Sequence, residues 1–447
     1  MSGLRVSSET YSTLSALLLG ADGLESCAIG FAGHDPINER WLLSEFEAVP
    51  PDAYLHRDAV SVSLKPEVLV DIVNRARRNG LTPVLIHSHP QAVGTPVFSS
   101  VDNAGEAEMK PYFDCRLLQM RPLAMVVGPE GCSAREFGTG KSVQVWQVGT
   151  DLLRFDGAGS DDAVACRHDR QIRAFGRAGQ KIISTLRILV IGAGGTGSVT
   201  VQQLAYLGAC DITVIDPDNV EESNLNRLVG AGPDDIGSPK VEIARRAVHF
   251  VNPAAKVQAI VGDIVDEAMA DMIAGFDFVF LCTDSHASRA VAGQAAYQFL
   301  VPTIDMGVSI TVSAGKITHI TGRVQMLSPG LPCLSCTGAL DASEIRREML
   351  TPEQCNADPY VQGRREPQPA VVSLNSTMAS LGMTMFMAAV TAVPAQARFQ
   401  MYDGIRGTTR NATAARQPAC VVCSCDGALA QGLRWPLPVR PAATRHD

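Results

Sequence analysis

A glycine-rich turn between a strand and a helix is the feature that most constrains how this chain folds. The turn, GAGGTG at residues 192–197, follows the apolar run LRILVI and opens a stretch with helical patterning, after which ITVID reads as a second strand. This order predicts a βαβ unit in a doubly wound parallel sheet. Backbone N–H groups and the positive helix end at such a turn receive phosphates, so the candidate nucleotide-binding glycines are Gly192, Gly194, Gly195 and Gly197.

The residues after the turn help to separate two nucleotide ligands. Asp216 ends the second strand, 19 residues beyond Gly197, where a carboxylate can bond ribose hydroxyls. To this point an NAD-dependent dehydrogenase fits equally well. Three basic residues suit a triphosphate better than a dinucleotide: Arg170, Arg227 and Lys240. Asp284, at the carboxyl end of the strand DFVFLCTD, is placed to hold Mg²⁺ beside ATP.

Five motifs in order over about 120 residues resemble the ThiF/MoeB family and the adenylation domains of ubiquitin-activating enzymes: RHDRQIRAFGRAGQ, GAGGTG, DPDNVEESNLNR, DIGSPK and CTD. The resemblance implies that a C-terminal glycine carboxylate attacks the α-phosphate of ATP, releasing pyrophosphate and leaving an acyl-adenylate. It implies that Asp216 binds ribose, that Asn224 and Arg227 line the phosphates, that Lys240 neutralises them and that Asp284 binds magnesium. It also implies a homodimer, in which Arg170 completes the active site of the partner.

The N-terminal half contains a compact set of metal-ligating residue types. His87 and His89 are two apart on the predicted strand TPVLIHSHP, so their side chains share a face and can share a zinc ion, with Asp102 as third ligand. Three protein ligands leave a fourth position for a water whose pKa zinc lowers toward ~7. Glu25 can act as its base, and the hydroxyl of Ser99 can stabilise an oxyanion.

HSHP, SSVD and the upstream Glu25 resemble the JAMM motif of the JAB/MPN metalloproteases, which hydrolyse isopeptide or peptide bonds after a glycine. The resemblance implies Glu25 as general acid/base, His87, His89 and Asp102 as ligands of a catalytic Zn²⁺, and Ser99 as oxyanion helper. The nine residues 90–98 between His89 and Ser99 form a longer loop than the family commonly has, so Ser100 is an alternative. An inactive MPN-like scaffold is the non-enzymatic alternative.

Two C-x-x-C pairs predict a second, structural zinc site. Cys333 with Cys336 and Cys420 with Cys423 supply four thiolates for a closed tetrahedral site, and Cys425 is an alternative to one of the last two. Between the pairs, Cys355 lies in a segment rich in Pro, Gly and charge. Resemblance to activating enzymes implies that Cys355 can take the acyl group as a thioester or take part in sulfur transfer; an incidental loop cysteine is the alternative.

Length and composition set the domain organisation. The 447 residues exceed one usual core, and we expect a JAB/MPN-like α/β metalloprotease domain at 1–155, a linker at 156–165 and a doubly wound, Rossmann-like adenylation domain at 166–447. Residues 1–20 are predicted to form an amphipathic helix rather than a signal peptide, and the uncharged segment 373–393 a buried helix rather than a membrane span. The thiol-rich composition then favours the cytoplasm.

Charge and motifs together define the expected partners. A net charge of −8 gives no basic footprint for nucleic acid or anionic membranes. The leading hypothesis is a bifunctional enzyme that adenylates the C-terminal glycine of a ubiquitin-like protein and matures or deconjugates that protein, with a conjugating enzyme as a further partner, in a bacterial conjugation pathway such as a defence pathway. The alternative is activation of a sulfur carrier for thiocarboxylate-dependent cofactor or cysteine synthesis.

Overall fold

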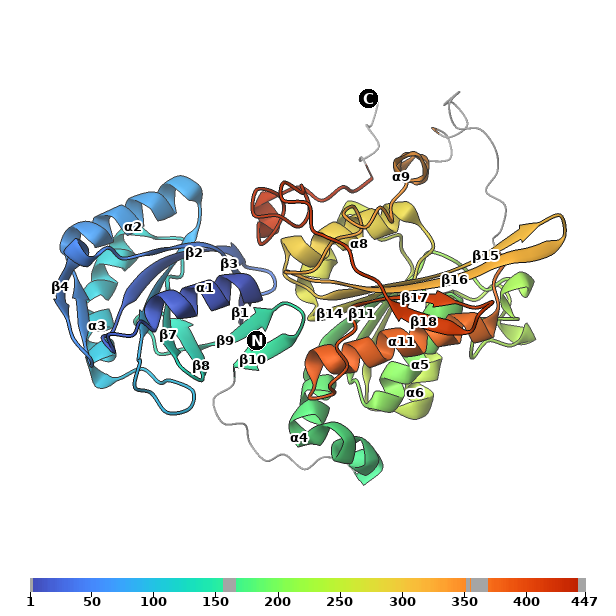
Figure 1. The fold of residues 1–447 in the computed structure, drawn as a ribbon, viewed down its shortest axis with the longest axis horizontal. Coiled ribbons are helices and arrows are strands. Elements are labelled where there is room, and N and C mark those ends of the chain that lie inside the picture. The colour runs from blue at the N-terminus through green and yellow to red at the C-terminus, as the bar shows by residue number, and fades with distance from the viewer. Residues whose placement is uncertain (1–2, 156–165, 351–353, 355–368, 441–447) are drawn as a thin grey trace. The chain divides into compact units, whose positions relative to one another are not determined.

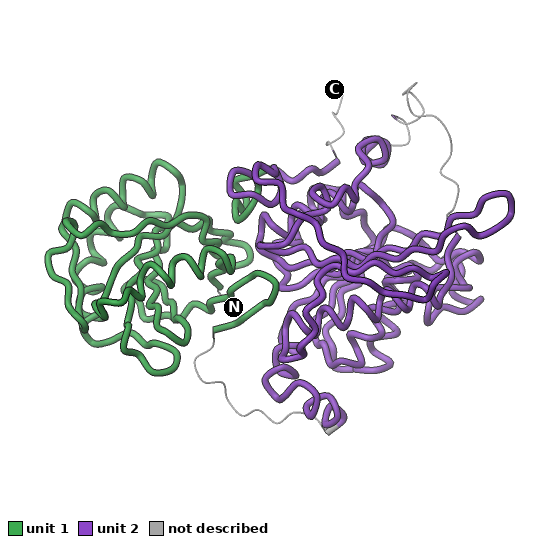
Figure 2. Tube along the Cα trace, in the orientation of Figure 1, with its two compact units in different colours: residues 1–162, 428–435 green, residues 163–427, 436–447 purple. Residues whose placement is uncertain are grey.

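The computed structural model describes residues 3–155, 166–350, 354 and 369–440, and these form two compact units (Figure 2). Unit 1 comprises residues 1–162 with 428–435, and unit 2 comprises residues 163–427 with 436–447. The expected linker, 156–165, lies outside the described residues. The segment Ala428–Trp435 groups with unit 1, whereas the sequence predicts it in the C-terminal domain. A distant segment of chain therefore completes the first unit.

Unit 1 is built on an eight-stranded sheet in the order β1-β3-β2-β6-β7-β8-β9-β10 (Figure 1). Strand β1 pairs in parallel with both β3 and β9, so the first seven strands of this order close into a ring. A separate hairpin is formed by β4 and β5. The strands are β1 Gly3–Ser7, β2 Cys27–Asp35, β3 Arg40–Ala48, β4 Tyr54–Arg57, β5 Val62–Leu64, β6 Thr82–Ser88, β7 Leu123–Gly128, β8 Gly131–Glu136, β9 Ser142–Val148 and β10 Leu152–Phe155.

Three helices cover this sheet: α1 Ser8–Leu18, α2 Pro66–Asn79 and α3 Ser100–Arg116. Leu14 and Leu18 of α1 pack into one apolar core with side chains of β1, β3 and β7. Residues of α2 and α3 pack into a second core, where Ile72, Val73 and Ala76 form the buried face of α2. The two cores lie against different side chains of the same strands because successive residues of a strand alternate between its faces.

The expectation of one helix over residues 1–20 is wrong. Gly3–Ser7 forms β1, all five residues of which are buried, and Ser7 then caps α1 by accepting a hydrogen bond from the Thr10 N–H. Pairing with strands on both sides decides the conformation of this short segment, and tertiary pairing of this kind overrides local propensity. The helical pattern in the sequence is correct only from Ser8 onward.

Unit 2 contains a second eight-stranded sheet in the order β13-β12-β11-β14-β15-β16-β17-β18. The first five strands of this order run parallel and the last three continue antiparallel. The strands are β11 Arg187–Ile191, β12 Asp211–Ile215, β13 Lys256–Ile260, β14 Phe278–Leu281, β15 Thr303–Ser313, β16 Lys316–Leu327, β17 Phe399–Asp403 and β18 Thr408–Asn411.

Helices cover both faces of this sheet, with α5, α6 and α11 on one face and α8 on the other (Figure 1). This arrangement confirms the predicted doubly wound α/β fold. The helices are α4 Asp169–Thr185, α5 Gly195–Leu207, α6 Lys240–Val251, α7 Glu267–Asp271, α8 His286–Gln298, α9 Ala342–Met349 and α11 Val372–Val390.

The uncharged segment predicted to be a buried helix forms α11. Its Phe386 packs edge to face against Phe278 and Phe280 of β14, with ring centroids 4.8 and 5.3 Å away. Aromatic contacts of this geometry stabilise a core beyond the area they bury. Within the part of the chain that the structure describes, no helix combines the length and apolarity that crossing a bilayer requires.

Candidate functional site

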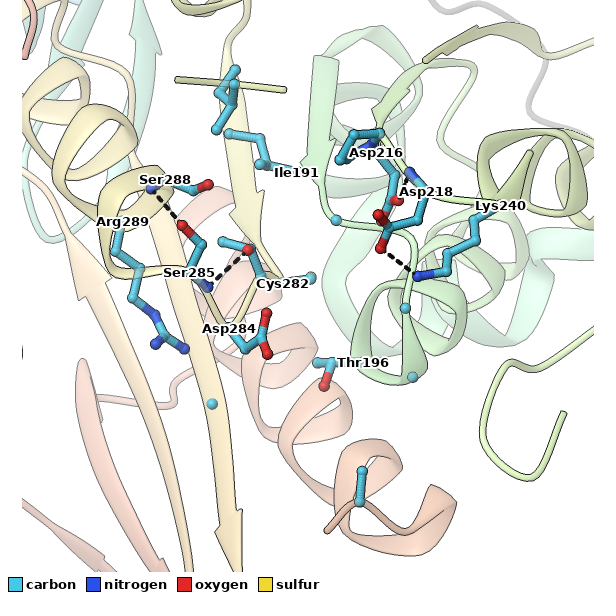
Figure 3. A pocket seen from close by; sticks show the side chains of 18 of the residues that line it. Ile191, Thr196, Asp216, Asp218, Lys240, Cys282, Asp284, Ser285, Ser288 and Arg289 are labelled. Atoms are coloured by element: carbon cyan, nitrogen blue, oxygen red, sulfur yellow. Dashed lines mark hydrogen bonds and ion pairs between the residues drawn. The ribbon is translucent and has the colours of Figure 1, made fainter. Parts of the chain in front are cut away.

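A cavity of about 1080 Å³ opens at the carboxyl ends of the parallel strands of unit 2 (Figure 3). Strand β11 pairs with β12 on one side and with β14 on the other, so the strand order reverses at the first βα turn. Ligands of doubly wound sheets bind at this switch point. The cavity is lined by the ends of β11 and β12, by residues 282–284 directly after β14, by the first turn of α5 and by the start of α8.

The glycine turn can form only with glycine at two of its positions. Gly192 has φ +93°, and a Cβ at Gly197 would lie 1.9 Å from the Gly192 carbonyl oxygen, so an alanine there collides with backbone that cannot give way. A Cβ at Gly195 would lie 2.1 Å from the side-chain nitrogen of Asn375 in α11. Gly192, Gly194 and Gly195 line the cavity, whereas Gly197 lies against the Gly192 carbonyl group.

Asp216 joins the second strand to this turn. Its Oδ2 accepts a hydrogen bond from the Ala193 N–H at 2.7 Å, and its Oδ1 accepts one from the Asp218 N–H at 2.8 Å. Burial raises the pKa of this carboxyl, while the two backbone donors lower it. Each oxygen keeps a second lone pair for a ligand in the cavity. The position expected to bind ribose is therefore rigidly held against the phosphate turn.

The predicted basic and amide side chains also meet at the cavity. Lys240, the first residue of α6, donates from Nζ to Asp218 Oδ2 at 2.7 Å (Figure 3). Arg227 donates to the Ser223 carbonyl, and Asn224 Oδ1 accepts from the Glu221 N–H. These contacts orient the three side chains at the border of the cavity, where Asn224 lies in a 3₁₀ turn and Lys240 at the start of α6. All three predicted positions therefore gather around one volume.

Asp284 and Arg170 have different placements. Asp284 follows β14 and lines the cavity opposite Asp216 and Lys240 (Figure 3), as expected of a magnesium ligand. Arg170 is exposed at the start of α4 and does not line the cavity within its own chain. Its neighbour Gln171 donates to the Tyr206 carbonyl at 2.9 Å and so holds this end of α4 to the end of α5.

A buried charge cluster that the sequence does not predict lies beside the cavity. Asp305 of β15 is 0% exposed; it accepts from Arg289 Nε at 2.9 Å and from Arg323 of β16 at 2.5 Å. Arg289 lies on the first turns of α8 and lines the cavity. Two arginines compensate the desolvation of one carboxylate. The sequence holds no local sign of this cluster, because its three members come from three elements.

In unit 1, three predicted ligands converge on one point. The Nε2 atom of His87 lies 3.1 Å from Asp102 Oδ1, and that of His89 lies 3.4 Å from Asp102 Oδ2. The two Nε2 atoms are 3.2 Å apart. Tetrahedral zinc with nitrogen and oxygen ligands at ~2.0–2.1 Å places its ligand atoms about 3.3 Å apart. The donor set therefore fits one zinc ion.

Glu25 and Ser99 border the same point. Glu25 Oε1 lies 3.6 Å from His89 Nε2, Arg57 donates to the Glu25 carbonyl at 2.8 Å, and burial raises the pKa of the Glu25 carboxyl. Ser99 caps α3: its Oγ accepts from the Asp102 N–H, and Asp102 Oδ2 accepts from the Ser99 N–H at 2.6 Å. Ser100 is exposed as the first residue of α3. The geometry thus favours Ser99 over Ser100 as the neighbour of the cluster.

The cysteine pairs of unit 2 form the second cluster. The Sγ atoms are 3.6 Å apart for Cys333–Cys336, 3.5 Å for Cys333–Cys420 and 3.6 Å for Cys336–Cys423. Tetrahedral zinc with Zn–S bonds of ~2.3 Å requires about 3.8 Å, so four thiolates fit the ion with slight expansion. Cys425 is exposed and lies outside the cluster. Cys355, the candidate thioester residue, lies outside the described residues.

Comparisons with known proteins match the same region. The model of the ThiF family matches residues 168–422, which is more than half of the chain. The chain belongs to the ThiF family. It is 31% identical over 264 residues to the molybdopterin-synthase adenylyltransferase of Salmonella typhimurium, covering 59% of this chain and 97% of that protein. It is 32% identical over 161 residues to the SAMP-activating enzyme E1 of Haloferax volcanii, covering 36% and 56% respectively.

Among solved structures, the chain is similar to E. coli MccB with ATP, with a TM-score of 0.47 and 19% identity over 59% of this chain and 76% of that one. The family match makes unit 2 a ThiF adenylation domain. It begins at residue 168, so it does not extend to unit 1. The JAB/MPN-like domain expected at residues 1–155 stays a prediction.

Proposed function

We propose that the ThiF domain uses ATP and Mg²⁺ to adenylate the C-terminal glycine of a ubiquitin-like or sulfur-carrier protein. The observation that carries this proposal is the single cavity in which the glycine turn, Asp216, Lys240 and Asp284 meet at the switch point of the sheet. The names of the relatives support it, since one is an adenylyltransferase and the other an activating enzyme E1.

The residues divide the work between the nucleotide and its metal. The glycine turn and the start of α5 receive phosphates, Asp216 binds the ribose, and Asn224 and Arg227 border the phosphates. Lys240 neutralises their charge once it turns from Asp218 to the ligand. Asp284 would hold magnesium, which supplies charge compensation at the reacting phosphate. Exposed Arg170 is proposed to reach the cavity of a second copy, so that the active form is a homodimer.

ATP–pyrophosphate exchange tests this proposal directly. Exchange should appear with a glycine-ended carrier and be absent with the same carrier lacking that glycine. Asp284→Ala should lower the exchange rate by about 10²-fold or more, because the metal contributes several kcal/mol to the transition state. Exchange that persists unchanged in Asp284→Ala would remove this residue from the site. The homodimer is tested by mixing Arg170→Ala chains with Asp284→Ala chains, since a mixed dimer would keep one cavity with both residues intact. The exchange rate should then recover in part, and sedimentation measures whether dimers form.

A second function is proposed for unit 1: zinc-dependent hydrolysis of a peptide or isopeptide bond after glycine. The observation that favours it is the His87, His89 and Asp102 cluster, whose donor atoms fit one zinc ion with Glu25 adjacent. Zinc bound there would supply Lewis acidity and lower the pKa of water to ~7. Glu25, partly shielded from solvent, would take a proton from the nucleophile and pass it to the leaving amine. The Ser99 hydroxyl proton would stabilise the developing oxyanion.

Removal of zinc tests the hydrolase separately from the ThiF domain. Brief treatment with a chelator should abolish cleavage of a carrier with a C-terminal extension, and added Zn²⁺ should restore it. ATP–pyrophosphate exchange should survive the same treatment, because the four-cysteine site is proposed to be closed and structural. Cleavage that resists chelation would contradict the hydrolase proposal and leave the adenylation proposal standing.

The two units would then act on one partner, with unit 1 maturing or removing the carrier that unit 2 activates. Two pathways have to be distinguished. One is conjugation of a ubiquitin-like protein, with a conjugating enzyme downstream, and the other is sulfur transfer from a thiocarboxylate carrier. Incubation with candidate carriers, ATP and Mg²⁺, followed by mass spectrometry of both chains, distinguishes a thioester on Cys355 from a thiocarboxylate on the carrier. Loss of the thioester mass in Cys355→Ala is the control.

A further inference from the structure

The nine-residue loop 90–98 that joins His89 to Ser99 is held at its end by strand β8. Ser133 of β8 donates from Oγ to the Pro96 carbonyl at 2.7 Å. Two residues further along β8, the guanidinium of Arg135 lies 3.8 Å from the centroid of the Phe98 ring. Cation–π contacts at this distance are attractive, and more so where water is partly excluded. The end of the lengthened loop is therefore fixed from outside the metal cluster.

Arg135 is itself held by α3. Its Nε and one terminal nitrogen donate to Glu106 Oε1 at 3.0 and 2.7 Å, and the other terminal nitrogen donates to Asn103 Oδ1 at 2.7 Å. The side chains of Arg135 and Glu106 are only 11% and 7% exposed. Glu106 Oε2 accepts from the Gly138 N–H at 2.7 Å, which completes the pairing that a buried charge requires. The guanidinium thus has a single orientation.

This network reaches the proposed zinc ligands by two short routes. Phe98 directly precedes Ser99, whose backbone N–H and side chain form the capping box with Asp102. The Phe98 ring also lies against the His87 ring, with centroids 6.1 Å apart. In addition, Asn103 and Glu106 belong to the first turns of α3, the helix that carries Asp102. Arg135 therefore fixes both sides of Asp102 relative to the strand that carries His87 and His89.

We propose that Arg135 is a positioning residue for the metal centre of unit 1, acting by clamping Phe98 and the start of α3 so that Asp102 faces His87 and His89. This inference rests on the proposed hydrolase function. The clamp explains how the loop 90–98, which is longer than the loop common in the JAMM motif, still places Ser99 and Asp102 beside the histidines. It assigns a role to three side chains, Phe98, Glu106 and Arg135, that the metal cluster itself does not use.

Cobalt binding by the full chain tests the clamp without relying on hydrolysis. The four-cysteine site is first filled with Zn²⁺, and Co²⁺ is titrated while the weak visible bands of nitrogen and oxygen ligation are followed. Phe98→Leu keeps an apolar side chain but removes the flat ring, and Arg135→Met keeps the stem but removes the charge. Both should weaken Co²⁺ affinity by about 10- to 100-fold, the loss typical of residues that orient metal ligands, and should change the band shape.

Arg154→Met is the matched control. Arg154 of β10 lies 5.6 Å from the centroid of the Trp146 ring, so this substitution removes a similar cation–π contact from the same unit. It should bind Co²⁺ as the unaltered chain does. Should Arg135→Met unfold by leaving Glu106 unpaired, the folded Phe98→Leu variant decides. Unchanged affinity in folded Phe98→Leu would overturn the clamp alone. Failure of the unaltered chain to bind Co²⁺ outside the cysteine site would overturn the hydrolase proposal and the clamp together.

Discussion

The donor atoms are similarly spaced in the two clusters of candidate metal ligands, but the number and the exposure of the ligands differ. Donor atoms lie 3.1–3.4 Å apart in the histidine and aspartate cluster and 3.5–3.6 Å apart in the cysteine cluster. The first has three ligands, each 13–17% exposed, with the carboxyl of Glu25 beside them. The second has four thiols, three of them buried, from segments 87 residues apart. The proposed difference between a catalytic site and a structural one therefore rests on the number of ligands and on their neighbours, rather than on their spacing.

The largest expected effect concerns the proposed catalytic cluster of unit 1. Glu25→Gln keeps the shape of the side chain but removes its basicity, and it should lower the hydrolysis rate by about 10²- to 10⁴-fold, the usual contribution of a positioned acid or base. Single-turnover cleavage of a carrier fusion measures this loss. Zinc content, determined by elemental analysis, should stay unchanged. A variant that cleaves at the normal rate would show that Glu25 is not the acid or base of the hydrolysis.

A smaller effect is expected on the structural side. Cys423→Ser should lower the melting temperature of the ThiF domain by on the order of 10 °C, because loss of one thiolate forfeits several kcal/mol of metal-linked folding energy. Calorimetry measures the shift. Hydrolysis by unit 1 should remain.

Cys425→Ser provides the matched control, since this third thiol of CVVCSC is exposed and lies outside the cluster. Its melting temperature should equal that of the unaltered chain. Equal losses in both variants would mean that the ligand set differs from the one described, and the contrast between open and closed sites would have to be redrawn.

The smallest effect concerns the cap of α3. Ser99→Ala removes the side chain that accepts from the Asp102 N–H, and we expect about 1 kcal/mol lower stability of unit 1. Hydrolysis should fall further than this stability loss explains, because the hydroxyl is also proposed to stabilise the oxyanion. Denaturant unfolding and kcat measure the two effects. Ser100→Ala, one residue along and exposed, should change neither; a loss of kcat there instead would reassign the oxyanion role.

The parts of the molecule that the sequence predicted are those encoded by short segments. The glycine turn, Asp216 and the two cysteine pairs are local patterns whose geometry follows from strand and helix periodicity, so their placement was foreseeable. The Asp305 cluster was not, because Arg289 and Arg323 meet it only after α8 and β16 pack beside β15. The Arg135 clamp was missed for the same reason. Side chains that act through a third element leave no spacing in the sequence to detect.

Two segments differ from the prediction for a related reason. The conformation of Gly3–Ser7 is decided by partners 37 or more residues away, as its register with Arg40 and Gln144 shows. The segment Ala428–Trp435 belongs to unit 1, where Gly432 would place a Cβ 3.0 Å from Leu42. Neither segment is long enough to show a decisive period, so long-range pairing determines where each one goes.

The ring of unit 1 also has a consequence for the order of events during synthesis. Within unit 1, β1 is synthesised before β2 to β8, yet its partner β9, Ser142–Val148, is synthesised after them. Until β9 is made, the sheet has two open edges with unpaired backbone groups, which can pair with other chains. Contacts of such large sequence separation also slow folding. The growing chain therefore exposes unpaired strand edges while β2 to β8 are synthesised. Slow translation over this stretch should favour aggregation over pairing of β1 with β9.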